Sequence, residues 1–137
     1  MPSMNEFEKA FSLQGQRAVI TGGASGLGFA MAKCFIAAGA EAVLIGRSPE
    51  RLEKACRELG EKAAYYPYDI TDTARAGAVA DRIRRERGEV TILCNNAGNH
   101  CKKPIEEMTV EDFTRVLNTH VVGSFALTRA FVPHMKR

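Results

Sequence analysis

The strongest constraint on the fold is a glycine-rich turn between an apolar strand and a helix. Residues 17–21 (RAVIT) form a short apolar run, and residues 22–28 (GGASGLG) follow it directly. Residues 29–38 are largely apolar and end at Gly39, which is typical of a helix and its stop. This order predicts a βα unit. Because Lys33 is the only charge in residues 29–38, we expect this helix to be buried on most sides.

Strand and helix patterns then alternate along the rest of the chain. Further strands are expected at residues 42–45, 63–68 and 90–94, and helices at residues 49–59, from Thr71 or Asp72 to Gly88, and from Thr109 almost to the C-terminus. Right-handed crossovers join such strands in parallel. The sequence therefore predicts an α/β fold, a Rossmann-like doubly wound parallel sheet with strand order 3-2-1-4. We expect residues 13–137 to form this incomplete domain and residues 1–12 to be a leader.

Composition excludes several classes of protein. With 137 residues the chain has the size of one domain, and 45% hydrophobic residues make it too apolar for disorder. Nowhere does it contain the roughly 18 to 20 consecutive apolar residues of a membrane span. Its first residues include Glu6 and Glu8 and lack an apolar stretch, so they do not resemble a secretory signal. We therefore expect no membrane partner.

Charge and cysteine content point to a cytoplasmic protein. The net charge is +3, and the basic run Arg82–Arg87 is interrupted by an acid, which favours a solvated helix end over a nucleic-acid surface. No metal site is expected, because His100 beside Cys101 lacks further ligands at a useful spacing. Three of the four cysteines lie in apolar patterns typical of buried thiols, and no CxxC pair occurs among Cys34, Cys56, Cys94 and Cys101. A reducing compartment follows.

The glycine-rich turn is suited to phosphate. Its backbone N–H groups and the positive end of the following helix can meet a pyrophosphate. Glycine at Gly22, Gly26 and Gly28 permits positive φ angles and close approach of a ligand to the main chain. The spacing differs from the common GxGxxG pattern. The alternative is that these glycines only make a tight turn.

Arg47 follows the second strand at the point where a dinucleotide-binding protein selects its cofactor. An acidic residue there pairs with the ribose hydroxyls of NAD, whereas an arginine accommodates the 2′-phosphate of NADP. The acid is missing and Arg47 is present. We therefore favour NADP, with NAD as the alternative. Arg47 can also be an arginine that simply precedes the helix cap.

Polar residues also follow the third and fourth strands. Asp69 lies at the end of the third strand, on the side where open α/β sheets bind ligands, although it can also be a turn or cap residue. Residues 95–98 (NNAG) follow the fourth strand and face the glycine turn across the switch point of the sheet. No hairpin follows them, so a generic turn does not explain this tetrapeptide.

The last helix contains a run of poor helix formers, residues 118–123 (NTHVVG). Most of them cost about 0.5 to 1 kcal/mol relative to alanine in a helix. Tertiary contacts must offset this cost, so the stretch is either packed tightly or placed for function. By itself Asn118 is as readily a helix-kink residue as a functional one.

Together these features resemble the short-chain dehydrogenase/reductase family, over nearly the whole chain from about Leu13. Within this family the pattern is similar to members like gluconate 5-dehydrogenase or 3-oxoacyl-carrier-protein reductase. The resemblance implies an NAD(P)-dependent oxidoreductase that transfers hydride between nicotinamide and a secondary alcohol or ketone. It assigns cofactor binding to Gly22, Ser25, Gly26, Leu27, Gly28, Arg47, Asp69, Ile70, Asn96, Ala97 and Gly98. Asn118 corresponds to the asparagine of the family's catalytic tetrad, which positions a water in the proton relay.

The chain departs from the family in what it lacks. The other tetrad members are a serine after a fifth strand and a tyrosine and lysine spaced YxxxK, and no YxxxK occurs here. We therefore expect a sheet truncated before strand 5 and a chain that is itself inactive. The alternative is a non-catalytic nucleotide-binding or oligomerisation module. Without a fifth strand, residues 90–94 form an exposed sheet edge and the last helix exposes the surface that would pack on the missing half. We therefore expect the chain either to self-associate, as a homo-oligomer, or to retain the missing segment. Lys102 and Lys103 can favour an anionic substrate or belong to a solvated loop.

Overall fold

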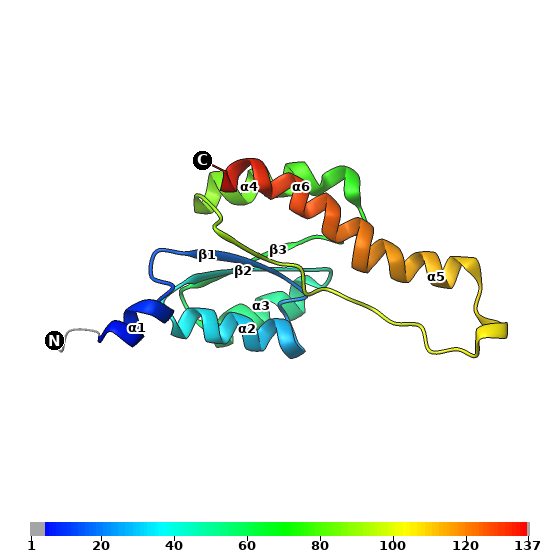
Figure 1. Ribbon diagram of the computed structural model, residues 1–137, viewed down its shortest axis with the longest axis horizontal. Coiled ribbons are helices and arrows are strands. Elements are labelled where there is room, and N and C mark those ends of the chain that lie inside the picture. Colours follow the sequence, from blue (N-terminus) through cyan, green and yellow to red (C-terminus); the bar gives the residue numbers. More distant parts are fainter. Residues whose placement is uncertain (1–4, 137) are drawn as a thin grey trace.

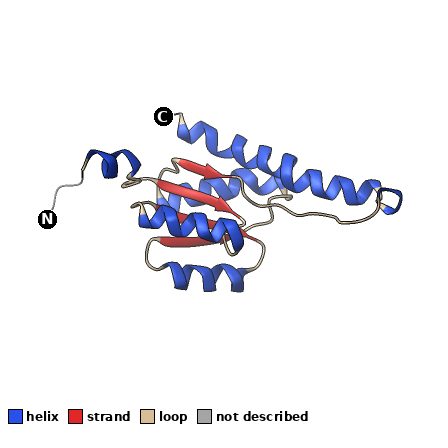
Figure 2. Ribbon diagram, turned by 60° about the horizontal axis from the view of Figure 1, so that its bottom comes forward, coloured by secondary structure: helices blue, strands red, loops and turns tan. Residues whose placement is uncertain are grey.

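A computed structural model describes residues 5–136 of the chain. Its centre is one parallel sheet with strand order β3-β2-β1-β4. The strands are β1 (Arg17–Thr21), β2 (Glu41–Gly46), β3 (Ala63–Pro67) and β4 (Ile92–Cys94). Figure 2 shows the strands between layers of helices. The predicted Rossmann-like doubly wound sheet with order 3-2-1-4 is confirmed.

Helices cover both faces of this sheet. They are α1 (Glu6–Phe11), α2 (Gly26–Ala37), α3 (Pro49–Leu59), α4 (Ala76–Arg87), α5 (Val110–Leu117) and α6 (Ser124–Met135), with short 3₁₀ turns at Thr73–Arg75 and Ile105–Glu107 and a π-helical segment at Asn118–Gly123. In Figure 1, α2 and α3 lie on one face and α4 and α6 on the other, while α5 extends beyond the sheet. Within residues 5–136 no helix combines the length and apolarity that a bilayer crossing requires.

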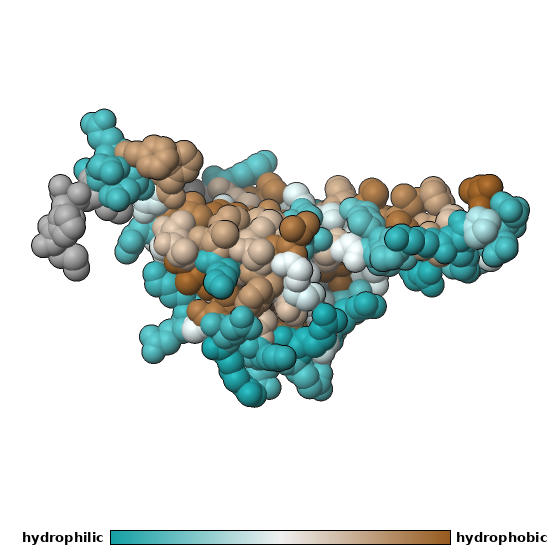
Figure 3. Space-filling model, turned by 90° about the horizontal axis from the view of Figure 1, so that it is seen from below, coloured by the Kyte–Doolittle hydropathy of each residue, from teal (hydrophilic) through white to brown (hydrophobic). Residues whose placement is uncertain are grey.

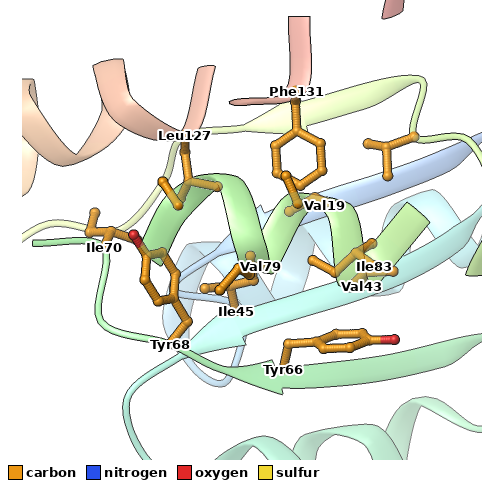
Figure 4. Close-up of a cluster of buried hydrophobic side chains, with 13 residues drawn as sticks. Val19, Val43, Ile45, Tyr66, Tyr68, Ile70, Val79, Ile83, Leu127 and Phe131 are labelled. Atoms are coloured by element: carbon orange, nitrogen blue, oxygen red, sulfur yellow. The ribbon is translucent and has the colours of Figure 1, made fainter. Parts of the chain in front are cut away.

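The core consists of two apolar layers, one on each face of the sheet. Alternate residues of β1 and β2 enter opposite layers: Val19, Val43 and Ile45 face α4 and α6, and Ala18, Ile20 and Leu44 face α2 and α3. Leu127 and Phe131 of α6 close the first layer (Figure 4). Burial on both faces is the physical reason that these strands are continuous apolar runs.

Several predicted helix ends are confirmed. The Ser48 hydroxyl accepts a hydrogen bond from the Arg51 N–H at 3.3 Å, and Pro49 occupies the first turn of α3. Thr109 and Asp112 form a reciprocal capping box at the start of α5. The helix expected to begin after Thr71 or Asp72 instead starts with the 3₁₀ turn Thr73–Arg75, and Asp72 makes no side-chain cap bond to it.

The expectation for the first long helix is wrong in two respects. α2 begins at Gly26, so the last glycines of the turn form its first helical turn. Within α2, Gly28 and Ala32 are buried, whereas Leu27 is 78% exposed and Cys34 is exposed. The reason is that α2 packs on the sheet through one side only. An apolar composition on all sides does not guarantee that all sides are covered.

Two further differences lie at the edges of the fold. β4 begins at Ile92, two residues later than expected, and its three residues are half-buried because it forms one edge of the sheet. The leader contains the short helix α1, with a capping box between Asn5 and Glu8 that sequence analysis missed. The Leu13 N–H donates to the Ala38 carbonyl at 2.8 Å, and this hydrogen bond joins the segment after α1 to the C-terminal end of α2.

Candidate cofactor-binding site

A cavity of about 690 Å³ opens at the carboxyl ends of the strands. This is the end of an open α/β sheet where ligands bind, and the volume is within the range of small-molecule sites. Seven of the residues predicted to bind a cofactor line it, and they come from four separate segments: Gly22, Ser25, Arg47, Asp69, Ile70, Ala97 and Gly98. Folding therefore brings together the loops that follow β1, β2, β3 and β4.

The backbone donors of the glycine turn that can meet an anion are those at the start of α2, because the Gly22 and Gly23 N–H groups already donate to the Ile45 carbonyl. Gly22 and Gly26 have φ angles of +65° and +56°, which L side chains rarely adopt. Ser25 is the N-cap of α2 but makes no side-chain cap hydrogen bond, unlike Ser48 and Thr109 at the starts of α3 and α5. The first N–H groups of α2 therefore lack the side-chain acceptor that usually satisfies one of them. An anion at this position can accept from them.

Gly28 sets how closely α2 approaches the turn. A Cβ atom at Gly28 would lie 2.2 Å from the Gly22 carbonyl oxygen and 2.6 Å from Nδ2 of Asn96. No side chain fits at those distances, so glycine is required here for packing. Three predicted residues, Gly26, Leu27 and Gly28, do not line the cavity, and the Leu27 side chain is 78% exposed.

A buried hydroxyl joins the glycine turn to the loop after β4. Thr21 is 1% exposed, and its Oγ1 accepts hydrogen bonds from the Asn96 and Ala97 N–H groups at 3.0 and 2.9 Å. The same hydroxyl donates to the Cys94 carbonyl at 3.3 Å. In return, Nδ2 of Asn96 donates to the Thr21 carbonyl at 3.1 Å. Asn96, predicted as a cofactor ligand, thus braces the two loops and does not line the cavity.

Asp69 combines the two roles that its sequence position allowed. It lines the cavity, and its Oδ1 accepts from the Thr71 N–H and hydroxyl at 2.9 and 2.8 Å. Partial burial raises the pKa of Asp69, but the hydrogen bonds from Thr71 and the positive charge of Arg47 outweigh it and leave the pKa below its ordinary value. Asp69 is therefore an ionised acceptor beside the cavity at neutral pH.

A basic corner lies at the end of β2. Arg47, Ser48 and Arg51 all line the cavity there. Sequence analysis missed Arg51, although its place in the first turn of the helix that follows Arg47 was a usable signal. Two guanidinium groups beside the N-terminus of α3 make this corner favourable for a phosphate.

Asn118 and His120 belong to the same segment of the last helix but contact different parts of the molecule. Asn118 lines a second, more open cavity of about 460 Å³ together with Thr71, Thr114 and Arg115, and not the first cavity. His120 instead contacts the loop after β4: its Nε2 lies 2.7 Å from the Asn99 carbonyl oxygen. Sequence analysis singled out Asn118 and missed His120, as well as Thr119, which lines the first cavity.

The loop that leads to α5 is held by an ionic cluster. Asp112 is 8% exposed, and its carboxylate accepts from Lys103 at 2.7 Å and the Thr109 N–H at 3.2 Å, with Arg115 at 3.4 Å. Lys103 is therefore engaged by the protein and is not a free charge for a substrate. These hydrogen bonds, that of Lys103 first, lower the pKa of Asp112 to about 2.

Because of this low pKa, the stability of the fold should depend on pH in the acidic range. A carboxyl whose pKa is lower in the folded than in the unfolded state stabilises the fold above its unfolded pKa of about 4, and this contribution is lost as the pH falls. We expect the urea midpoint of the wild type to drop between about pH 4 and 2 more than that of Asp112→Asn. Equal pH dependence of the two proteins, measured by circular dichroism, would contradict this role of Asp112.

Comparisons with known proteins agree with this geometry. The family model described as short chain dehydrogenase matches residues 16–137. Gluconate 5-dehydrogenase from Gluconobacter oxydans is 37% identical, over 91% of this chain and 50% of its own length. The crystal structure of L-sorbose reductase from Gluconobacter frateurii, complexed with NADPH and L-sorbose, has a TM-score of 0.86 and 34% identity, covering 92% of this chain and 49% of that chain.

A second solved structure supports the same relationship. The 3-ketoacyl-(acyl-carrier-protein) reductase from Brucella melitensis, complexed with NADH, has a TM-score of 0.86 and 36% identity, covering 91% of this chain and 52% of that chain. The chain thus spans about half the length of the curated relatives it matches. The family model covers most of the chain, and the sheet order is the one that the sequence predicted. The chain therefore belongs to the short-chain dehydrogenase family.

Proposed function

We propose that this chain binds a nicotinamide dinucleotide, NADP in preference to NAD, through the cavity at the ends of the strands. The observation that carries the proposal is the free N-terminus of α2. Ser25 makes no cap bond there, and the turn before it has the positive φ angles that let a phosphate approach the main chain. Family membership and relatives solved with NADPH or NADH support it.

Each loop that lines the cavity would contact a different part of the cofactor. The backbone from Ser25 to Gly28 would hold the pyrophosphate. Asp69 and Ile70 would meet the adenine, and Ala97 and Gly98, which line the cavity beside the glycine turn, would contact the adjacent ribose. Asn96 would act indirectly, because its side-chain amide donates to the Thr21 and Gly22 carbonyls and so holds the glycine turn in place. We take residues 13–137 as the nucleotide-binding unit and residues 1–12 as a leader.

The basic corner would select NADP. Arg47 and Arg51 would bind the 2′-phosphate that NAD lacks. In Arg47→Ala we expect NADPH to bind about tenfold more weakly, since a charge-assisted hydrogen bond is worth about 1.5 kcal/mol. NADH binding should change less than about threefold. Isothermal titration of both cofactors measures this difference.

Arg57→Ala is the matched control. Arg57 lies on α3, the helix that follows Arg47, and is paired with Glu53 at 2.8 Å, outside the cavity. It should bind NADPH like the wild type. Equal loss of NADPH and NADH affinity in Arg47→Ala would contradict NADP selection by this corner, and no binding of either cofactor to the folded wild-type chain would contradict the proposed function itself.

For the whole protein we propose an oxidoreductase acting on a secondary alcohol or ketone. The bound nicotinamide would supply or accept the hydride. Asn118 is the residue of this chain that the family resemblance gives a catalytic role. Because this chain contains no YxxxK pair, we expect the 137 residues alone to bind cofactor without turnover. The second candidate function is a non-catalytic binding module, and a turnover assay on a panel of ketones separates the two.

We also propose a homo-oligomer formed through the last helix. Apolar side chains follow one another along it at helical spacing and are 39% to 76% exposed: Val110, Phe113, Leu117, Val121 and Phe125. Figure 3 shows apolar surface along one edge of the projecting arm that contains α5. Exposed apolar rows of this size are typical of interfaces.

We also propose a reducing, cytoplasmic setting, because the four cysteines of the described residues are free thiols.

The oligomer proposal is tested by light scattering. The wild-type chain is expected to elute as a dimer or larger species, and Phe113→Glu combined with Phe125→Glu to elute as a monomer, because two buried charges in an apolar interface are costly. Phe7→Glu, on the separate helix α1, serves as the control. A wild type that stays monomeric at high concentration would refute a self-association surface here.

A further inference from the structure

The six residues from Asn118 to Gly123 form a π-helical segment that contacts two of the cofactor-site loops. Gly123 is buried, and a Cβ atom there would lie 2.7 Å from the Ile70 carbonyl oxygen. The glycine thus lets the helix meet the loop after β3. Three residues earlier in the same segment, His120 meets the loop after β4. π-helical turns often occur at functional sites.

The His120 ring is in close contact with Gly98 and Asn99. Its Nε2 lies 2.7 Å from the Asn99 carbonyl oxygen and 3.1 Å from the Asn99 backbone nitrogen. A Cβ atom on Gly98 would approach Cε1 of the ring to 2.6 Å. His120 is an exposed residue, so hydrophobic burial does not hold the ring in this position. Its polar contacts to the backbone do.

We propose that His120 is a positioning residue that fixes Gly98 and Asn99 at the rim of the cofactor cavity. Both of these residues line that cavity, so the proposal rests on the proposed function. Asn118, two residues earlier, faces the second cavity instead. His120, rather than Asn118, is therefore the polar side chain of this segment that acts on the loop after β4.

Imidazole suits this role because either neutral tautomer makes one bond to the loop. With a proton on Nε2, the ring donates to the Asn99 carbonyl oxygen; without it, Nε2 accepts from the Asn99 N–H. Glutamine can reproduce both interactions, since its amide lies the same number of bonds from Cβ as Nε2 does. Alanine can reproduce neither.

The proposal predicts graded effects in two measurements on the 137-residue chain. In His120→Ala, exchange of the Asn99 amide in the cofactor-free protein should become about fivefold faster, and the Kd for NADPH should rise by about the same factor, as expected for the loss of one net hydrogen bond. His120→Gln should recover most of both effects. His100→Ala, the same substitution at the exposed next position of the same loop, should change neither.

Two results in the His120 variants would overturn the proposal. Unchanged Asn99 exchange in His120→Ala overturns the proposal, and so does equal loss in the Ala and Gln variants, which would mean that ring volume matters rather than hydrogen bonding. If the wild type fails to bind NADPH, the proposed function fails. The exchange measurement still tests whether His120 holds the loop, because it requires no cofactor.

A double-mutant cycle tests the contact itself. Gly98 does not have a positive φ angle, and His120 supplies the three atoms nearest to a Cβ placed there. Gly98→Ala should therefore lower the urea midpoint in the wild type and lower it much less in the His120→Ala background. Equal effects in both backgrounds would show that the ring does not lie against Gly98, and would overturn the proposal.

Discussion

Replacing Gly28 with alanine is expected to destabilise the fold by about 3 kcal/mol, at the upper end of what overpacking costs. The added Cβ would lie 2.2 Å from the Gly22 carbonyl oxygen. That atom belongs to the backbone of the glycine turn and cannot move aside as the tip of a side chain can. Either α2 or the turn must shift, and both shape the cavity. NADPH binding should therefore be lost even at temperatures where the variant remains folded.

Gly77→Ala is the matched control for this substitution. Gly77 lies in α4, and nothing approaches within 4 Å of a Cβ placed on it. Because alanine is the better helix former, Gly77→Ala should stabilise the protein by about 0.5 to 1 kcal/mol. Urea unfolding followed by circular dichroism gives both values. A Gly28→Ala variant as stable as the wild type would mean that α2 does not pack against the turn as described.

Replacing Thr21 with valine should cost about 2 kcal/mol or more, although the two side chains have nearly the same shape. The Thr21 hydroxyl accepts from two backbone N–H groups, of Asn96 and Ala97, at a site that is 1% exposed. Valine leaves both donors without this acceptor, and a buried unsatisfied group costs about 1 to 3 kcal/mol. The loop after β4 is then free to leave the glycine turn, so NADPH binding should weaken as well.

Thr21→Ser separates the hydroxyl from the methyl group. Serine keeps the acceptor and loses one methyl, so its destabilisation should be smaller than that of valine, about 1 kcal/mol. The free energy of unfolding of the three proteins in urea gives the order. If Thr21→Val proves more stable than Thr21→Ser, the hydroxyl is not the link between the two loops.

The features that sequence analysis predicted correctly are those with local signals. β1 was predicted at its observed bounds because an apolar run ends at glycines, and Ser48 and Thr109 were found because caps follow fixed residue preferences. The sheet order follows from the handedness of βα crossovers once the strands are known. Gly22 and Arg47 line the cavity because each directly follows a strand, and Asp69 does so two residues after the end of β3.

The features that sequence analysis missed depend on contacts between distant segments. Asn96 binds Thr21, 75 residues away, and its brace role has no sequence signature. The sequence did not show which side of α2 faces solvent, because its residues are apolar on all sides. The π-helical turn at Asn118–Gly123 adds a residue to the helix, and one residue corresponds to a rotation of about 100°. Helical spacing therefore does not reveal that His120, rather than Asn118, meets the loop.

The central claim is that the cavity at the strand ends binds a nicotinamide dinucleotide. Its most direct test is amide shift mapping of the isotope-labelled 137-residue chain titrated with NADPH. We predict saturable shifts concentrated at the glycine turn around Gly26, at Arg47, at Asp69 and at Gly98. A folded chain whose amides do not shift, or whose shifts fall on the apolar face of α5, would contradict the account.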